Sequence, residues 1–171
     1  MLARDVADRP GSGANTTSDV DKRLYLEALL LIERLHRRLL DVLKAELDNV
    51  GRNDINNVQA LILHNIGDEE VTVGELTNRG YYLGSNVSYN VKKLVENGYL
   101  LQERSPHDRR SVRVRLSEKG LQLHGQVNAL FERHIAALRQ QDELDMRELS
   151  DTNTALRGLE SFWSAQVRFG G

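Results

Sequence analysis

The sequence of 171 residues contains no cysteine and only two prolines. The absence of cysteine excludes a disulfide scaffold, a cysteine-ligated zinc or iron–sulfur site, and any chemistry that works through a thiolate. No apolar run approaches the roughly 20 residues that a membrane span needs, and the first residues lack the apolar region of a signal peptide. We therefore expect a cytoplasmic protein that has no membrane partner.

The residues that are present are typical of a globular protein. Hydrophobic residues make up 40% of the chain and charged residues 28%, and 25 acidic against 23 basic side chains give a formal charge of −2. This length and composition fit one domain, or one compact domain with extensions, that buries a real core.

The hydrophobic periodicity predicts a mainly helical chain with one small β-hairpin. Residues 1–20 are rich in small polar residues and glycine, so we expect a flexible tail there. Helices are predicted over residues 21–48, 54–66, 72–79, 85–97, 118–140 and 144–167. Strands are predicted over residues 99–104 and 111–117, with a charged turn between them.

Several predicted helix ends carry capping residues. Asp54 and Ser117 are expected to cap the helices that follow them, and Thr72 with Glu75 has the spacing of a capping box. Gly98 is expected to end the helix before it.

Two short helices followed by a hairpin predict a winged helix-turn-helix over residues 53–117. The flanking segments, residues 21–52 and 118–168, are predicted to be long helices that form a dimerisation region. They carry more apolar surface than the small winged core can cover, which favours a homodimer. This surface includes Phe131, Phe162, Trp163 and Val167.

Positive charge is concentrated in the predicted winged region. Residues 79–119 contain nine Lys or Arg and four acidic side chains, a net charge of +5, which leaves −7 for the rest of the chain. A basic face on an acidic protein is expected for contact with phosphates, so double-stranded DNA is the predicted partner.

The predicted helix over residues 85–97 has two distinct faces at about 100° per residue. Its apolar side is formed by Val87, Val91, Leu94 and Val95. Its other side carries residue types that contact bases and phosphates in a major groove, although a solvated polar face is the alternative. The predicted DNA-binding residues of this helix are Ser85, Asn86, Ser88, Tyr89, Lys92 and Lys93.

The hairpin adds a second group of predicted DNA-binding residues. Its tip holds Asp108, Arg109 and Arg110, while Arg113 and Arg115 share one strand face. We expect Arg110 to enter the minor groove and Asp108 to orient its guanidinium group. The alternative is a surface turn that only contributes to solubility.

These segments resemble the MarR family of bacterial winged-helix regulators, and within it the LdtR-type regulators of alphaproteobacteria. The resemblance rests on the helix 85–97, the Gly98-Tyr-Leu turn, the Asp108-Arg-Arg tip and Leu116-Ser-Glu-Lys-Gly120. The last segment is similar to the family's Leu-Thr-x-x-Gly, with Ser117 in place of threonine. The resemblance covers about residues 21–168.

The resemblance implies an obligate homodimer that carries two winged heads onto a pseudo-palindromic operator, usually as a repressor. It also implies a small, often aromatic effector that binds in a crevice beside the DNA-binding region and lowers the affinity for DNA. The effector contacts implied for this chain are Arg34, Leu35, Leu61 and His64.

Other classes of function find little support in the sequence. The five histidines show no short paired spacing, so we expect no metal site and no cofactor. The chain has no glycine-rich phosphate loop and no obvious pair of nucleophile and base, so we do not expect an enzyme. The alternative function is a winged-helix scaffold that binds protein without specific DNA binding. The polar face of the helix 85–97 argues against that alternative, because a protein-binding helix is expected to show an apolar stripe.

Overall fold

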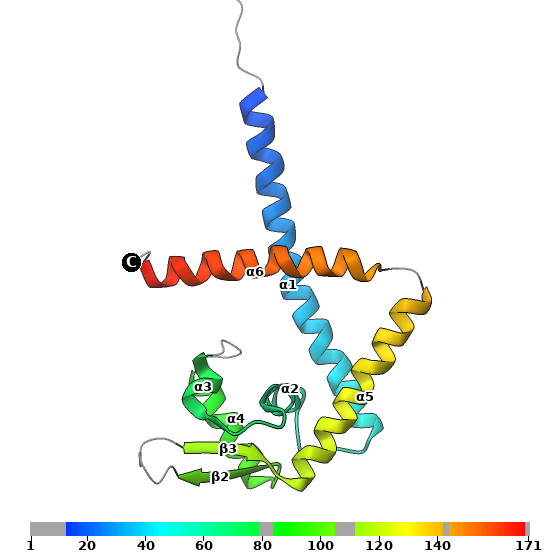
Figure 1. The fold of residues 1–171 in the computed structure, drawn as a ribbon, viewed down its shortest axis with the longest axis vertical. Helices are drawn as coiled ribbons and strands as arrows, with labels where there is room; N and C mark the ends of the chain where they lie inside the picture. Colours follow the sequence, from blue (N-terminus) through cyan, green and yellow to red (C-terminus); the bar gives the residue numbers. More distant parts are fainter. Residues whose placement is uncertain (1–12, 79–83, 105–111, 142–143, 170–171) are drawn as a thin grey trace, which may run out of the picture. The chain divides into compact units, whose positions relative to one another are not determined.

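The computed structural model describes residues 13–78, 84–104, 112–141 and 144–169, which belong to two compact units, residues 1–61 and 62–171. Its elements are α1 (Gly13–Asn49), α2 (Asn57–Ile66), β1 (Val71–Thr72), α3 (Val73–Asn78), α4 (Gly84–Glu96), β2 (Leu100–Arg104), β3 (Val112–Leu116), α5 (Glu118–Gln141) and α6 (Met146–Phe169) (Figure 1). The predicted class, mainly α with a small β element, is confirmed.

Helix α1 is longer than the sequence predicted. It begins at Gly13 and not near residue 21, so residues 13–20 of the expected flexible tail are part of a helix. Each Ser, Thr or Asn inside a helix costs only about 0.5 kcal/mol of helix stability relative to Ala. The helix that the apolar residues favour can therefore extend through this polar segment, which contains no proline.

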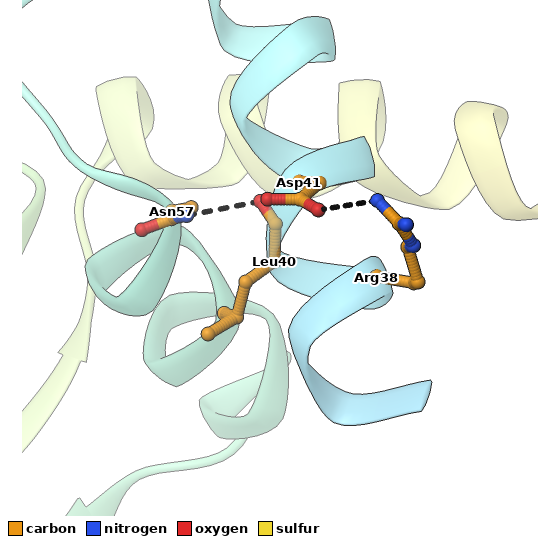
Figure 2. Close-up of polar contacts among 4 residues, drawn as sticks. All are labelled: Arg38, Leu40, Asp41 and Asn57. Carbon is orange, nitrogen blue, oxygen red and sulfur yellow. Dashed lines mark hydrogen bonds and ion pairs between the residues drawn. The ribbon is translucent and has the colours of Figure 1, made fainter. Parts of the chain in front are cut away.

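The unit of residues 1–61 includes a corner between α1 and α2. The Asn57 side-chain amide donates a hydrogen bond of 2.9 Å to the Leu40 carbonyl, and Arg38 pairs with Asp41 at 3.3 Å (Figure 2). Gly51 ends the turn after α1 with φ of 69°, in the left-handed region that glycine adopts without strain. Buried apolar side chains of this unit are Leu43, Leu47, Ile55 and Ala60.

Asn56 caps α2, so the prediction of Asp54 as the cap is wrong. The backbone amide of Gln59 donates to Asn56 Oδ1 at 2.8 Å, and the backbone amide of Asn56 donates to Gln59 Oε1 at 3.1 Å. This reciprocal pair is a capping box, and it places the helix start two residues later than Asp54 would.

The sheet of the second unit has three antiparallel strands in the order β1-β3-β2. The predicted hairpin is β2 with β3, which lie side by side (Figure 1). In its register Leu100 pairs with Leu116. The sequence did not predict β1, which pairs Val71 with Val114. Two residues are too few to show the alternation that identifies a strand.

Helices α3 and α4 begin and end as predicted to within two residues. Thr72 and Glu75 form the expected capping box of α3, with hydrogen bonds of 2.6 Å and 3.1 Å between side chains and amides. Gly98 closes the turn after α4 with φ of 74°. The predicted apolar side of α4 is buried at Val87, Val91 and Leu94 and half-buried at Val95. These side chains belong to the core of this unit, together with Leu76, Tyr99, Leu100, Val114 and Leu123.

Helices α5 and α6 also begin at capping side chains. The Gly120 amide donates to Ser117 Oγ at 3.0 Å, which confirms Ser117 as the cap of α5, and the Arg147 amide donates to Asp145 Oδ1 at 2.8 Å. Among the described residues, no helix is long and apolar enough to cross a membrane.

Candidate nucleic-acid interface

One face of α4 presents polar and basic side chains to solvent. Asn86, Ser88, Tyr89 and Lys92 are exposed, with 60% of Tyr89 accessible, and Lys93 is half-buried. Ser85 lies in α4, but its side chain falls outside the described part of the chain. Because the valines and Leu94 fix the opposite face in the core, this polar face is held outward. The structure therefore confirms the two-sided character of the helix.

Asn90, on the same helix, was not singled out from the sequence. Its side chain is 8% exposed and donates a hydrogen bond of 2.9 Å to the Asn86 carbonyl. Buried amides need such partners, and the Asn86 carbonyl supplies one. Sequence reasoning could have found it, since the spacing of four residues is that of a side chain bonding to the preceding turn.

Both lysines of α4 share one carboxylate that the sequence analysis also missed. Lys93 Nζ donates to Glu96 Oε2 at 2.7 Å, and Lys92 Nζ lies 3.9 Å from Glu96 Oε1. The hydrogen bond with Glu96 raises the pKa of Lys93, and the same bond lowers the pKa of Glu96. The spacings of three and four residues are those at which side chains meet on a helix, so the sequence contained the signal.

The strands of the hairpin hold two of the predicted arginines on one side. Arg113 and Arg115 are exposed on either side of buried Val114, as the strand alternation predicts. Arg113 Nη1 lies 3.7 Å from Glu70 Oε1, and Arg115 Nη2 lies 3.6 Å from Glu103 Oε1. The predicted tip residues Asp108, Arg109 and Arg110 lie outside the described residues.

The end of α4 is fastened to the start of α5 by polar contacts. Ser117 Oγ donates to the Gly98 carbonyl at 2.6 Å, and the Ser117 amide donates to the Tyr99 carbonyl at 3.0 Å. Lys119 Nζ donates to the Asn97 carbonyl at 2.9 Å and lies 4.1 Å from the centre of the Tyr99 ring. Carbonyl groups that a helix C-terminus leaves without intrahelical partners are satisfied in this way. The Leu-Ser-x-x-Gly segment therefore fixes the position of α4 against the base of the hairpin.

The four residues implied as effector contacts belong to both units of the chain. Arg34 and Leu35 are exposed on α1 and Leu61 is half-buried on α2, all within residues 1–61, whereas His64 lies in the second unit. Their arrangement as one site stays a prediction.

His64 itself takes part in a cluster of rings in the second unit. Its ring stacks on His124 with 5.2 Å between centroids and meets Phe131 edge-on at 5.1 Å. Its Nδ1 is buried without a hydrogen-bond partner among the described residues. Burial lowers the pKa of His64, and the neighbouring His124 lowers it further. A neutral His64 is therefore favoured in the folded protein.

Within the described ranges, no group of three or more His, Cys, Asp or Glu side chains is arranged to hold a metal ion. The exposed charged groups of α4 and the hairpin instead form an arrangement suited to phosphate contact. A helix with a polar outer face, beside a two-stranded wing, defines a winged-helix DNA-binding domain.

Comparison with known proteins gives the same class. Residues 55–120 match the family described as a winged helix DNA-binding domain. The exopolysaccharide II synthesis transcriptional activator ExpG of Rhizobium meliloti (strain 1021) is 39% identical over 169 residues, which are 99% of this chain and 83% of that protein.

Solved structures share the fold at low sequence identity. Staphylococcus aureus MarR in complex with salicylate and kanamycin has a TM-score of 0.68 at 20% identity, covering 84% of this chain and 95% of that one. Streptococcus pneumoniae FabT in complex with DNA has a TM-score of 0.63 at 20% identity, covering 82% of this chain and 97% of that one.

The chain belongs to the MarR family of winged-helix transcriptional regulators. It is a DNA-binding transcriptional regulator, and the expectation that it is not an enzyme is confirmed by the nature of its relatives. The family resemblance predicted from the sequence motifs is therefore correct.

Proposed function

We propose that the protein binds a pseudo-palindromic operator in duplex DNA as a homodimer, with α4 in the major groove and the hairpin at the adjacent minor groove. The observation that carries this proposal is the outer face of α4, where Asn86, Ser88, Tyr89 and Lys92 are exposed together. Asn and Ser bond to base edges, while Lys neutralises phosphates. The proposal places the protein in the cytoplasm, with the chromosome.

Exposed apolar side chains on the terminal helices support the dimer. Residues 53–117 would form the DNA-binding region, and residues 21–52 and 118–168 the dimerisation region. Large apolar side chains exposed in this number on a helix are unfavourable in water and are covered in a symmetric oligomer. Large apolar side chains that stay exposed in the single chain include Leu24, Leu31 and Leu35 on α1, and Leu156, Phe162 and Val167 on α6.

The direction of regulation is proposed to be activation. The family resemblance implied a repressor, but the relative from Rhizobium meliloti is named a transcriptional activator. At 39% identity over nearly the whole chain, that relative is the stronger guide. A reporter gene under the control of the protein's operator tests this choice. Activation requires reporter expression to fall when the gene of the regulator is deleted.

Modulation by a small aromatic effector is the last part of the proposal. We place this site near the ring cluster of His64, His124 and Phe131, because aromatic rings already pack against one another there. The Staphylococcus aureus relative was solved with salicylate, a compound of this chemical class. Effector binding shifts DNA affinity only if the ligand binds the free and the DNA-bound forms of the dimer with different affinities.

The experiment that tests the proposed function is selection of bound sequences from random duplex DNA with purified protein near physiological salt. Enrichment of an inverted repeat, with half-sites about 34 Å or a multiple apart, supports the dimeric operator-binding function. A folded dimer that enriches nothing, with and without a panel of aromatic acids, overturns it in favour of a protein-binding scaffold.

A further inference from the structure

Glu96 is the last residue of α4, and its contacts among the described residues are with lysines. Its carboxylate accepts a hydrogen bond from Lys93 at 2.7 Å and lies 3.9 Å from the ammonium group of Lys92. All three side chains are 42% to 75% exposed, so the cluster faces solvent on the helix that carries the proposed base contacts.

Helix stability does not account for an acidic residue at this position. The C-terminal end of a helix carries a partial negative charge, so a carboxylate there is unfavourable and a cation is favourable. A lysine that precedes its glutamate by four residues is also the less favourable order of such a pair. Exposed ion pairs contribute little to folding, and Glu96 is not among the buried side chains of the core.

We propose that Glu96 limits the affinity of α4 for duplex DNA. Its carboxylate pairs with the ammonium groups of Lys92 and Lys93, and a DNA phosphate has to displace it before it can contact them. This inference rests on the proposed function, because it requires α4 to lie against the DNA backbone. Phosphates carry no sequence information, so Glu96 weakens binding to every duplex by a similar factor. The effect on the protein is faster release from non-operator DNA, where phosphate contacts supply nearly all of the binding.

Arg113 and Arg115 have the same kind of partner on the hairpin, in Glu70 and Glu103. All four of the predicted DNA-binding cations whose side chains the structure describes therefore lie within 4 Å of a carboxylate. Glu96 differs from the other two acids because its carboxylate lies within 4 Å of two cations, Lys92 and Lys93. Its replacement is therefore expected to have the largest effect of the three acids.

The test compares Glu96→Gln with Glu132→Gln, which removes the same charge from an exposed position on α5. Dissociation constants are measured for the selected operator and for a scrambled duplex over a range of salt concentrations. Glu96→Gln is expected to tighten both by about three- to tenfold at low salt, with the gain shrinking as salt rises. Glu132→Gln is expected to change either by less than about twofold.

A variant that lacks both lysines shows whether the gain in DNA affinity depends on them. In the Lys92→Ala/Lys93→Ala protein, adding Glu96→Gln is expected to give no further tightening. A gain that persists in this background, or a Glu96→Gln protein that binds no tighter than Glu132→Gln, overturns the inference. Thermal unfolding of each variant, expected to match the unmodified protein, shows that binding rather than folding has changed.

Failure of the proposed function has a different signature. If the two lysine replacements leave the salt dependence of binding unchanged, α4 does not contact phosphates, and both the placement of α4 and this inference are wrong. If they reduce the salt slope by roughly one counterion each while Glu96→Gln behaves like Glu132→Gln, only the inference about Glu96 is wrong.

Discussion

Gly120 stands so close to Tyr99 that a β-carbon at position 120 would lie 2.2 Å from the Tyr99 carbonyl oxygen. No side chain fits in that space without moving the backbone at the end of α4. The close approach also lets the cap of α5 and the turn after α4 share the hydroxyl of Ser117. A glycine in the first turn of α5 is thus required by packing, not by flexibility.

Gly120→Ala is expected to destabilise the protein by about 1 to 3 kcal/mol, because the added methyl group overpacks the joint. Gly125→Ala is the matched control on the same helix, where no atom lies within 4 Å of the new β-carbon. It is expected to stabilise the helix by about 0.5 to 1 kcal/mol. Urea denaturation at fixed protein concentration measures both. Equal effects of the two substitutions would contradict the packing argument.

Asn86→Ala is expected to relax base preference at one position in each half-site, at a cost of about 1 to 3 kcal/mol for the preferred sequence. The substitution keeps the backbone carbonyl that Asn90 uses, so the helix should stay folded. Repeating the selection of bound sequences with the variant measures the change. If the motif comes back identical, Asn86 does not read a base.

Arg110→Ala is expected to weaken operator binding more than binding to scrambled DNA, with the greatest loss at sites flanked by A-tracts, whose narrow minor groove attracts arginine. Titrations against operators with and without A-tract flanks measure the difference. Equal losses on all duplexes would make Arg110 a phosphate contact instead.

Replacing His64 is expected to reduce the pH dependence of folding. Burial lowers the pKa of His64 below 6.5, so the unfolded chain binds the proton more readily than the folded protein does. The stabilisation from neutral His64 is therefore complete above about pH 6.5 and is lost as the pH falls through the folded pKa.

Urea unfolding of the unmodified protein and of His64→Gln, at about pH 7.5 and at lower pH, measures this contribution. The matched control is His134→Gln, at an exposed position of α5. It should retain the full loss of unfolding free energy on acidification. The same loss in all three proteins would show that His64 contributes nothing to it.

Leu156→Asp is expected to shift the protein from dimer toward monomer, because it puts a charge into the exposed apolar stripe of α6. Ser161→Asp adds the same charge to the same helix, rotated by about 140° from Leu156 at about 100° per residue. Sedimentation of both variants over a range of concentrations separates them. Indistinguishable behaviour would mean that this stripe does not form the interface.

Much of the local structure of the candidate interface could be predicted because its signals are local. The helix α4 shows its buried and exposed sides in the periodicity of 13 residues, and Thr72 with Glu75 shows a capping box in four. Each of these depends on contacts between residues that are close along the chain. The glycine after α4 and the serine before α5 are identified for the same reason.

The features that the sequence did not reveal depend on competition between two local signals, or on partners that are distant along the chain. Asp54 and Asn56 are both good capping residues, and only the reciprocal contact with Gln59 selects Asn56. Strand β1 exists because β3 passes beside it, and its partner Val114 lies 43 positions away. The ion pairs of Arg113 and Arg115 likewise depend on the register of the sheet.

Strand β3 is hydrogen-bonded on one side to the strand that leads into α3 and on the other to the strand that follows α4. Both strands of the hairpin therefore belong to one sheet with the strand that leads into α3. Because this sheet and the joint at Ser117 tie both elements together, the protein sets the distance between α4 and the strands β2 and β3, which the proposed function places at neighbouring grooves. Duplexes whose natural groove widths match that distance would be bound without distortion, and all others would have to bend or twist to fit.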